Sequence, residues 1–216
     1  MFQRLRELLL GPSGPPPLEE ERYPRDSLGR PDLTRFVRPA EYYAGYIDEY
    51  LSTLRPSPAD MEARSTESLR YAYRKGVLGQ WGLIARGPAE SLPFVVRLSS
   101  ESVPEGRQMA AGILEAWVSA DGNAAIEEHA VAATEREAAL DAPNVEALNG
   151  FVGILGRTRS QRALPLLARL LRLPSASNGD LDWATADAIA EIAGKAFDRS
   201  GDRREAAERW LRSQGL

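Results

Sequence analysis

Three arginines lie close together at a predicted turn between two helices. Arg157, Arg159 and Arg162 fall within six positions of the chain. A guanidinium group presents a planar set of donors that pairs with phosphate or carboxylate oxygens, and the N-terminal end of the following helix adds backbone N–H donors. We therefore predict that these arginines contact an anion or a partner. No aromatic residue is interleaved with them, so a solvated basic surface is the competing interpretation.

Tryptophan is the second residue type that suggests binding. The chain has four, each at an apolar position of a separate predicted helix: Trp81, Trp117, Trp183 and Trp210. Apolar positions of a helix predict core packing for all four. A tryptophan exposed on a binding face would instead anchor a partner, and we select Trp183 as the candidate for that role.

The residue types that most enzymes rely on are scarce. The chain has no cysteine and one histidine, His129, which excludes disulfides, thiol nucleophiles and any site that needs two imidazoles. His129 follows Glu127 and Glu128, and pairing with one of them would suit a general base. No nucleophile accompanies it, so a surface histidine is favoured. Motifs for nucleotide, zinc or calcium binding and for hydrolase nucleophiles are absent. We expect no catalytic residue, no cofactor and no metal, and therefore not an enzyme.

Charge is unevenly distributed along the chain. The formal net charge is −4, which disfavours attraction of the whole molecule to nucleic acid or anionic lipid. Residues 119–148 carry seven acids and one arginine, whereas residues 157–172 carry five arginines and no acid. This segregation predicts either a bipolar surface that orients a partner or two solvated faces that partly neutralise one another.

The N-terminal part has its own character. With 216 residues, 43% of them hydrophobic, the chain can bury a substantial core. Residues 1–10 suggest a short amphipathic helix and lack the apolar stretch of a signal peptide. Seven prolines between Gly11 and Pro39 predict an extended strap. No apolar run is long enough to span a membrane, so a cytoplasmic protein is expected.

Residues 39–87 predict two helices. An aromatic stripe at spacings of three and four marks the first, and a second apolar stripe marks the next, ended by Gly87 and Pro88. Glycines at 76, 79 and 82 predict a face that another helix approaches closely. The first stripe comprises Tyr42, Tyr43, Tyr46, Ile47, Tyr50, Leu51 and Leu54, and the second comprises Leu69, Tyr73, Val77, Trp81 and Ile84.

From residue 88 onward the chain repeats. The segment 111–117 aligns with 149–155 and with 187–193, two equal steps of 38 residues. Each copy predicts a helix pair, and a closing helix capped at Asp202 follows. Small residues beside bulky ones on each second helix allow neighbouring pairs to stack, because one pair cannot bury its own apolar face. The pairs are 88–99 with 104–118, 123–140 with 143–156, and 160–172 with 180–197.

This pattern resembles the HEAT repeats, including their bacterial HEAT-like group. Pro93 inside a first helix, Glu101 after it and Arg107 further on match the spacing of that family. Pro165 repeats the opening in the third copy. The resemblance covers roughly residues 66–216. It implies a kink at Pro93, and an acid and an arginine that form a polar ladder between adjacent repeats.

The expected fold class is all-α. The resemblance implies a HEAT-like α-solenoid of about three helix pairs, with a Pro-rich strap over residues 1–38, a helical cap over 39–87 and the repeats with a capping helix over 88–216. It also implies a non-catalytic protein-binding module: an adaptor, an assembly factor or an inhibitor with a protein partner. The alternative is a nucleic-acid-binding HEAT-like protein such as a DNA-glycosylase-like repair enzyme. A chromophore-lyase-like activity has only the fold in its favour.

Overall fold

The computed structural model describes residues 17–22, 25, 27, 29–55, 66–118, 124–173, 179–197 and 202–216 of the chain. These residues form α-helices and short 3₁₀ turns and no β-strand, apart from an isolated bridge between Arg25 and Pro31. The all-α prediction is confirmed. The predicted helix over residues 1–10 lies outside the described residues. The chain divides into two compact units, Met1–Ser91 and Leu92–Leu216, and each is described by itself.

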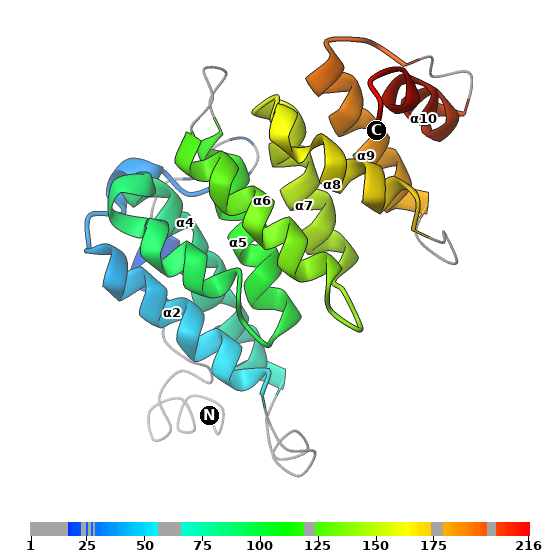
Figure 1. The fold of residues 1–216 in the computed structure, drawn as a ribbon. Helices are drawn as coiled ribbons and strands as arrows, with labels where there is room; N and C mark the ends of the chain where they lie inside the picture. The colour runs from blue at the N-terminus through cyan, green and yellow to red at the C-terminus, as the bar shows by residue number, and fades with distance from the viewer. Residues whose placement is uncertain are drawn as a thin grey trace, which may run out of the picture. The chain divides into compact units, whose positions relative to one another are not determined.

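Figure 1 shows the helices in chain order. The predicted helix pairs and the closing helix are present, with ends that differ from the sequence-based bounds by a few residues. The elements are η1 (Glu19–Arg22), η2 (Leu33–Arg35), α2 (Ala40–Thr53), α4 (Thr66–Leu98), α5 (Pro104–Trp117), α6 (Ala124–Ala138), α7 (Val145–Arg157), η3 (Gln161–Ala163), α8 (Leu164–Leu171), α9 (Gly179–Ala193) and α10 (Arg203–Ser213).

The described part of the strap is not purely extended. It contains the two turns η1 and η2, and the Asp32 carboxylate caps η2 by accepting hydrogen bonds from the backbone N–H and the hydroxyl of Thr34. Leu18 and Phe36 are buried. The strap therefore contributes apolar side chains to the core, and that burial offsets the entropy lost when a proline-rich segment is ordered.

Glycines let α4 approach α2 closely. A Cβ atom at Gly76 would lie 2.6 Å from the Tyr50 ring, one at Gly79 would lie 2.6 Å from the Tyr43 carbonyl oxygen, and one at Gly82 would overlap the Tyr43 ring. The glycines are thus the face on which the aromatic stripe of α2 rests, as the sequence predicts. Tyr43 is fully buried there, and its hydroxyl oxygen accepts a hydrogen bond from the Arg38 backbone N–H.

The apolar face predicted for this part of α4 is wrong. Tyr73 is 55% exposed, and the other four members of that stripe are only half-buried. Buried positions are instead the glycines with Ala72, Leu78 and Leu83. Because glycine has no side chain, the backbones of α4 and α2 come close together and the contact between the two helices is narrow. The larger residues of the predicted stripe therefore lie at the edges of this contact. On α2 the prediction holds better, although Tyr42 is exposed.

The break in α4 occurs at Gly87. Its backbone has φ 73° and ψ 174°, the only non-helical dihedrals in the helix, and this region is accessible essentially to glycine alone. A Cβ atom there would meet nothing within 4 Å, so the requirement for glycine is conformational and not steric. The break therefore falls where the sequence predicts one helix to end, at Gly87, and the next to begin. A kink at Pro93 stays a prediction.

In the second unit the second helices of the predicted pairs pack in series. Helix α7 packs against α5, against α9 and against its own partner α6, while α8 and α10 cover α9 (Figure 1). Helix α7 has no exposed residue from Ala147 to Gly156. A helix that is apolar on all sides must be enclosed by others, and α7 accordingly lies at the centre of this unit.

Small residues set the distance between these helices. A Cβ atom at Gly150 would lie 2.8 Å from the Ala111 Cβ on α5, and one at Gly156 would lie 2.8 Å from the Ala188 Cα on α9. Contacts below 3.0 Å are not tolerated, so both glycines are required for the close packing. The prediction that small residues on the second helices allow close stacking is confirmed.

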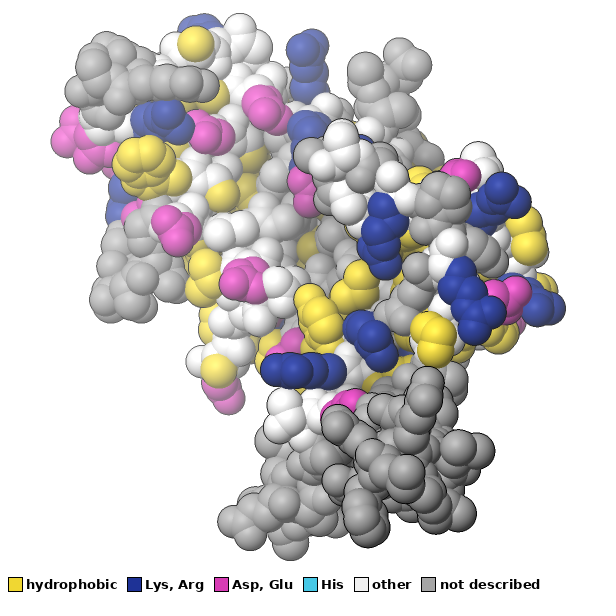
Figure 2. Space-filling view, turned by 180° about the vertical axis from the view of Figure 1, so that it is seen from behind, with side chains coloured by type: hydrophobic (Ala, Val, Ile, Leu, Met, Phe, Trp, Pro, Cys, Tyr) yellow, Lys and Arg dark blue, Asp and Glu magenta, His cyan; other side chains and the backbone are white. Residues whose placement is uncertain are grey.

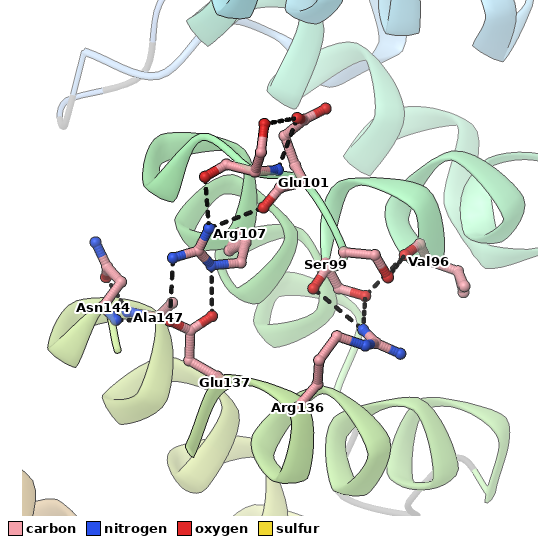
Figure 3. Close-up of polar contacts among 10 residues, drawn as sticks. Val96, Ser99, Glu101, Arg107, Arg136, Glu137, Asn144 and Ala147 are labelled. Atoms are coloured by element: carbon pink, nitrogen blue, oxygen red, sulfur yellow. Dashed lines mark hydrogen bonds and ion pairs between the residues drawn. The ribbon is translucent and has the colours of Figure 1, made fainter. Parts of the chain in front are cut away.

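A buried ion pair links α5 to α6 (Figure 3). The Arg107 Nε atom donates to a Glu137 carboxylate oxygen at 2.5 Å, and both side chains are almost completely buried. Arg107 also donates to the main-chain oxygens of Glu101 and Ser102. The carboxylate that pairs with Arg107 is therefore that of Glu137, thirty residues onward. Glu101 accepts a hydrogen bond from Arg107 through its main-chain carbonyl group.

Two further contacts extend this polar connection. The Glu137 carboxylate accepts a hydrogen bond from the Asn144 backbone N–H at 2.6 Å, at the start of α7. The neighbouring Arg136 donates to the carbonyl and hydroxyl oxygens of Ser99, at the end of α4 (Figure 3). Burying a charge is costly unless it is paired and hydrogen-bonded, and here Arg107 and Glu137 each have several partners.

We predict that Gly82→Ala lowers the free energy of unfolding by about 2 kcal/mol or more, because the new methyl group has no space beside Tyr43. The matched control is Gly45→Ala on α2, where a Cβ atom meets nothing within 4 Å. It should stabilise the protein by about 0.5–1 kcal/mol through helix propensity. Urea denaturation of both variants measures the difference, and equal stability would contradict close packing.

We predict that Arg107→Met lowers the free energy of unfolding by about 3–5 kcal/mol, because Glu137 is left buried without its charge partner. Arg107→Met combined with Glu137→Met should recover part of this loss. The control is Arg157→Met, which breaks an exposed ion pair with Glu115 and should cost less than about 1 kcal/mol. A double-mutant cycle in urea measures the coupling, and strict additivity would argue against the pair.

Candidate functional site

A cleft of about 640 Å³ lies where the C-terminal ends of α7 and α9 meet. The segment that leaves α9 and the first residue of α10 complete its wall. Most of the lining side chains are charged, and cations outnumber carboxylates. The lining residues are Gly156, Arg157, Arg159, Asp187, Ala190, Glu191, Gly194, Lys195, Ala196, Phe197 and Arg203.

Both helices end in the same capping arrangement. At the end of α7 the Ser160 N–H bonds to the Leu155 carbonyl and the Arg159 N–H bonds to the Gly156 carbonyl. At the end of α9 the Lys195 N–H bonds to the Ala190 carbonyl and the Gly194 N–H bonds to the Glu191 carbonyl. This pair of bonds defines the Schellman motif, which requires a left-handed residue just past the helix and usually takes glycine there.

Arg159 occupies the left-handed position of α7. Its φ is 53°, the only positive φ of a non-glycine residue in the described part of the chain, whereas the same position of α9 is Gly194 with φ 63°. A residue with a Cβ atom in this conformation costs about 1–2 kcal/mol relative to its usual region. The backbone of Arg159 is therefore strained at the position from which its side chain lines the cleft.

Two ion pairs account for part of the charge in the cleft. Arg157 pairs with Glu115 of α5 at 2.5 Å, and Arg203 contacts both carboxylate oxygens of Asp187 at 2.8 and 2.9 Å. Among the described residues, no ion pair involves Arg159 or Lys195. Both side chains are solvent-accessible, so these two cations remain able to bind an anion.

Glu191 is the other carboxylate in the cleft. Its Oε2 atom lies close to the α7 backbone, 2.7 Å from where a Cβ atom of Gly156 would stand. Partial burial raises the pKa of Glu191 above its ordinary value, and the nearby Asp187 carboxylate adds to the rise, against the opposing effects of Arg157 and Arg159. Removal of water from part of the carboxylate, together with repulsion from Asp187, thus outweighs the attraction of the two arginines.

The structure separates the three predicted arginines. Arg157 and Arg159 line the cleft, whereas Arg162 pairs with Glu127 of α6 at 2.9 Å. The cleft is built from helix C-termini. The sequence predicted that backbone N–H groups at the start of the next helix would contribute to anion binding, but none of the described lining residues comes from α8. His129 lies half-buried on α6 and is not among the described residues that line the cleft.

Trp183 is 62% exposed, so the prediction that it packs in the core is wrong. Its ring lies beside the cleft, with the Arg203 guanidinium carbon 5.1 Å from the ring centroid. Trp81, Trp117 and Trp210 are half-buried. Core packing is thus the wrong prediction for Trp183, and Trp183 is the tryptophan that the sequence also indicates as a candidate partner contact.

Sequence reasoning missed Lys195, Arg203, Asp187 and Glu191. The signal that was available is the helix end at Gly194: a glycine at the close of an apolar helical pattern marks a Schellman motif. Lys195 follows it directly and is one of two lysines in the chain. In the alignment of the second helices by 38 residues, Lys195 falls on Arg157, so the repeat itself could have added Lys195 to the candidate cations.

Cations in the first unit have different partners. Lys75 lies over the Tyr46 and Tyr71 rings and pairs with Glu49, and Arg38 lies over the Tyr42 ring. These contacts hold the charges against the protein's own surface.

The face in Figure 2 carries side chains of both signs with apolar side chains among them, so the overall net charge does not describe the local surface.

Comparison with protein-family models, curated proteins and solved structures finds no match in any of the three. Within the described residues, no helix combines the length and hydropathy needed to cross a bilayer. The same part of the chain holds no group of three or more histidine or acidic side chains arranged to bind a metal ion.

We predict that Glu191→Gln raises the free energy of unfolding at pH 7. Because the pKa of Glu191 is raised in the folded protein, folding favours its protonated form, and stability falls as pH rises from the ordinary value of 4.5 through the raised value. The glutamine variant cannot ionise at this position and does not lose this stability, so the free energies of unfolding of the two proteins should become similar below pH 4.5. Thermal unfolding across this range measures it, and a variant less stable at pH 7 would refute it.

Proposed function

We propose that this chain is a HEAT-like α-solenoid that binds a protein partner as a non-catalytic adaptor, assembly factor or inhibitor. The serial packing of α5, α7 and α9 supports the solenoid, because each of these helices buries its apolar side on the next. The Arg107–Glu137 contact supports it further, since it connects one predicted pair to the next as a polar ladder would.

The observation that carries the binding role is the exposed Trp183 beside a cleft with two available cations. Interfaces concentrate their binding energy in tryptophan, tyrosine and arginine side chains at partly enclosed positions. Trp183 is held over Arg203, and Arg203 is fixed by Asp187. A ring that is already oriented loses little conformational entropy on binding, which favours affinity.

The absence of cysteine suits a partner in the cytoplasm, where thiols are kept reduced. The chromophore-lyase-like alternative calls for a deep apolar pocket, and the cleft is instead lined mostly by charged side chains. We therefore retain the protein-binding role and a single competitor.

That competitor is a nucleic-acid function of the DNA-glycosylase-like kind. One observation favours it: Arg157 and Arg159 lie in the same cleft as Glu191, with Trp183 next to it. Such an enzyme needs basic side chains for the backbone and a carboxylate and an aromatic ring for the base. Asp187 and Glu191 oppose the approach of several phosphates, and the net charge of −4 does the same.

We predict that Trp183→Ala abolishes partner binding and changes stability by no more than about 1 kcal/mol, the size of an exposed cation–π contact. The full chain, with an affinity tag, is used to capture partners from native lysate with nuclease present, at low and high salt. A stoichiometric protein that is lost with Trp183→Ala is the expected result.

The matched control is Tyr73→Ala, because Tyr73 is similarly exposed and lies in the first unit. It should retain the partner. Retention of the partner by Trp183→Ala would move the interface away from the cleft. Recovery of nucleic acid without nuclease, lost steeply as salt rises, would favour the competing function.

A further inference from the structure

Three helices of the second unit end in the Schellman arrangement, and they differ in one respect. Helices α9 and α10 place Gly194 and Gly215 in the left-handed position, while α7 places Arg159 there. All three have the same pair of capping hydrogen bonds. Since glycine adopts this conformation without strain, Arg159→Gly would preserve the cap and relieve the backbone.

The strained residue and the end of α9 supply the two available cations. Arg159 is the left-handed residue of α7, and Lys195 directly follows the left-handed residue of α9. Both side chains line the cleft. The capping bonds satisfy terminal carbonyl oxygens of both helices, which reduces the negative partial charge that helix C-termini otherwise present. An anion in the cleft is therefore attracted by Arg159 and Lys195 and is repelled only weakly by the capped carbonyl groups.

The remaining charge of the cleft indicates the kind of anion. With Arg157 paired to Glu115 and Arg203 paired to Asp187, Arg159, Lys195 and Glu191 are left, one positive charge in excess. A single carboxylate balances that charge. A phosphomonoester dianion would exceed it and would face the Glu191 carboxylate in a partly desolvated site, where like charges repel more strongly. A phosphodiester carries one charge, as a carboxylate does, so the choice between these two rests on the proposed protein partner.

We propose that Arg159 and Lys195 form a carboxylate subsite that receives an acidic segment of the protein partner. This inference rests on the proposed function, because the acidic segment is taken to belong to the partner that Trp183 anchors. The subsite lies in the same cleft as Arg203, on which the Trp183 ring is held. A peptide with an acidic residue near an apolar one would engage both.

The test is fluorescence anisotropy of the full chain with a labelled oligoglutamate peptide, its oligoglutamine counterpart and labelled oligothymidylate. Oligoglutamate should bind and oligoglutamine should not. Arg159→Gly and Lys195→Gln should each weaken oligoglutamate binding about tenfold or more, the usual effect of losing a charged hydrogen bond. Arg159→Gly should unfold at the same temperature as the wild type or higher, which separates binding from folding.

The matched control is Arg162→Gln, which removes an equal charge close by in sequence from a side chain paired with Glu127. It should leave oligoglutamate binding within about twofold of the wild type. An equal loss in Arg162→Gln would overturn the subsite in favour of general electrostatic attraction. Tighter binding of oligothymidylate that depends on Arg159 would overturn it in favour of phosphate.

Failure of the subsite and failure of the proposed function are distinguishable. If oligoglutamate does not bind but Trp183→Ala still loses a captured partner, the subsite is wrong and the protein-binding role stands. If oligoglutamate binds through Arg159 and Lys195 while no protein is captured in a Trp183-dependent way, the cleft binds carboxylates and the adaptor function is wrong.

Discussion

The central constraint in the second unit is the burial of α7. From Ala147 to Gly156 this helix has no exposed residue, so α5, α6 and α9 must all pack on it. Gly150 and Gly156 allow the required approach of α5 and α9. The same approach brings the end of α7 beside the end of α9, and these two ends are walls of the cleft. The packing that stabilises the unit therefore also forms the charged cleft.

The buried Arg107–Glu137 pair has a different role from the apolar contacts around it. Two charges removed from water contribute little net stability even when well paired. Their value is geometric, because Arg107 reaches the carbonyls of Glu101 and Ser102 while Glu137 also receives the Asn144 N–H. A shift of α6 along α5 would break several of these bonds at once. Apolar side chains tolerate such a shift more easily, so the polar cluster fixes the register between the two helices.

Local patterns predicted the helices well and the surface poorly. Period-3.6 stripes, glycines at spacings of three and the cap at Asp202 report on backbone geometry within a few residues, and the structure contains these features. The exposure of Trp183 and the pairing of Arg162 with Glu127 depend on segments far apart in the chain, on which periodicity carries no information. Lys195 and Arg203 join Arg159 only because α7, α9 and α10 pack together. The buried glycine face of α4 illustrates the same limit: the sequence identified the glycines as a packing face but assigned the core to a different stripe.

Local rules are broken together at the cleft. An arginine stands where the two comparable helix ends have glycine, a tryptophan is exposed, and a carboxylate has a raised pKa. Each feature carries a free-energy penalty that a sequence shaped by stability alone would avoid. Natural proteins depart from such rules mainly at functional sites, where the penalty is offset by binding. Gly87 provides the contrast, because its unusual dihedrals are met by the one residue that adopts them freely. The chain thus uses glycine where only geometry is required and accepts strain at Arg159, where a side chain is needed.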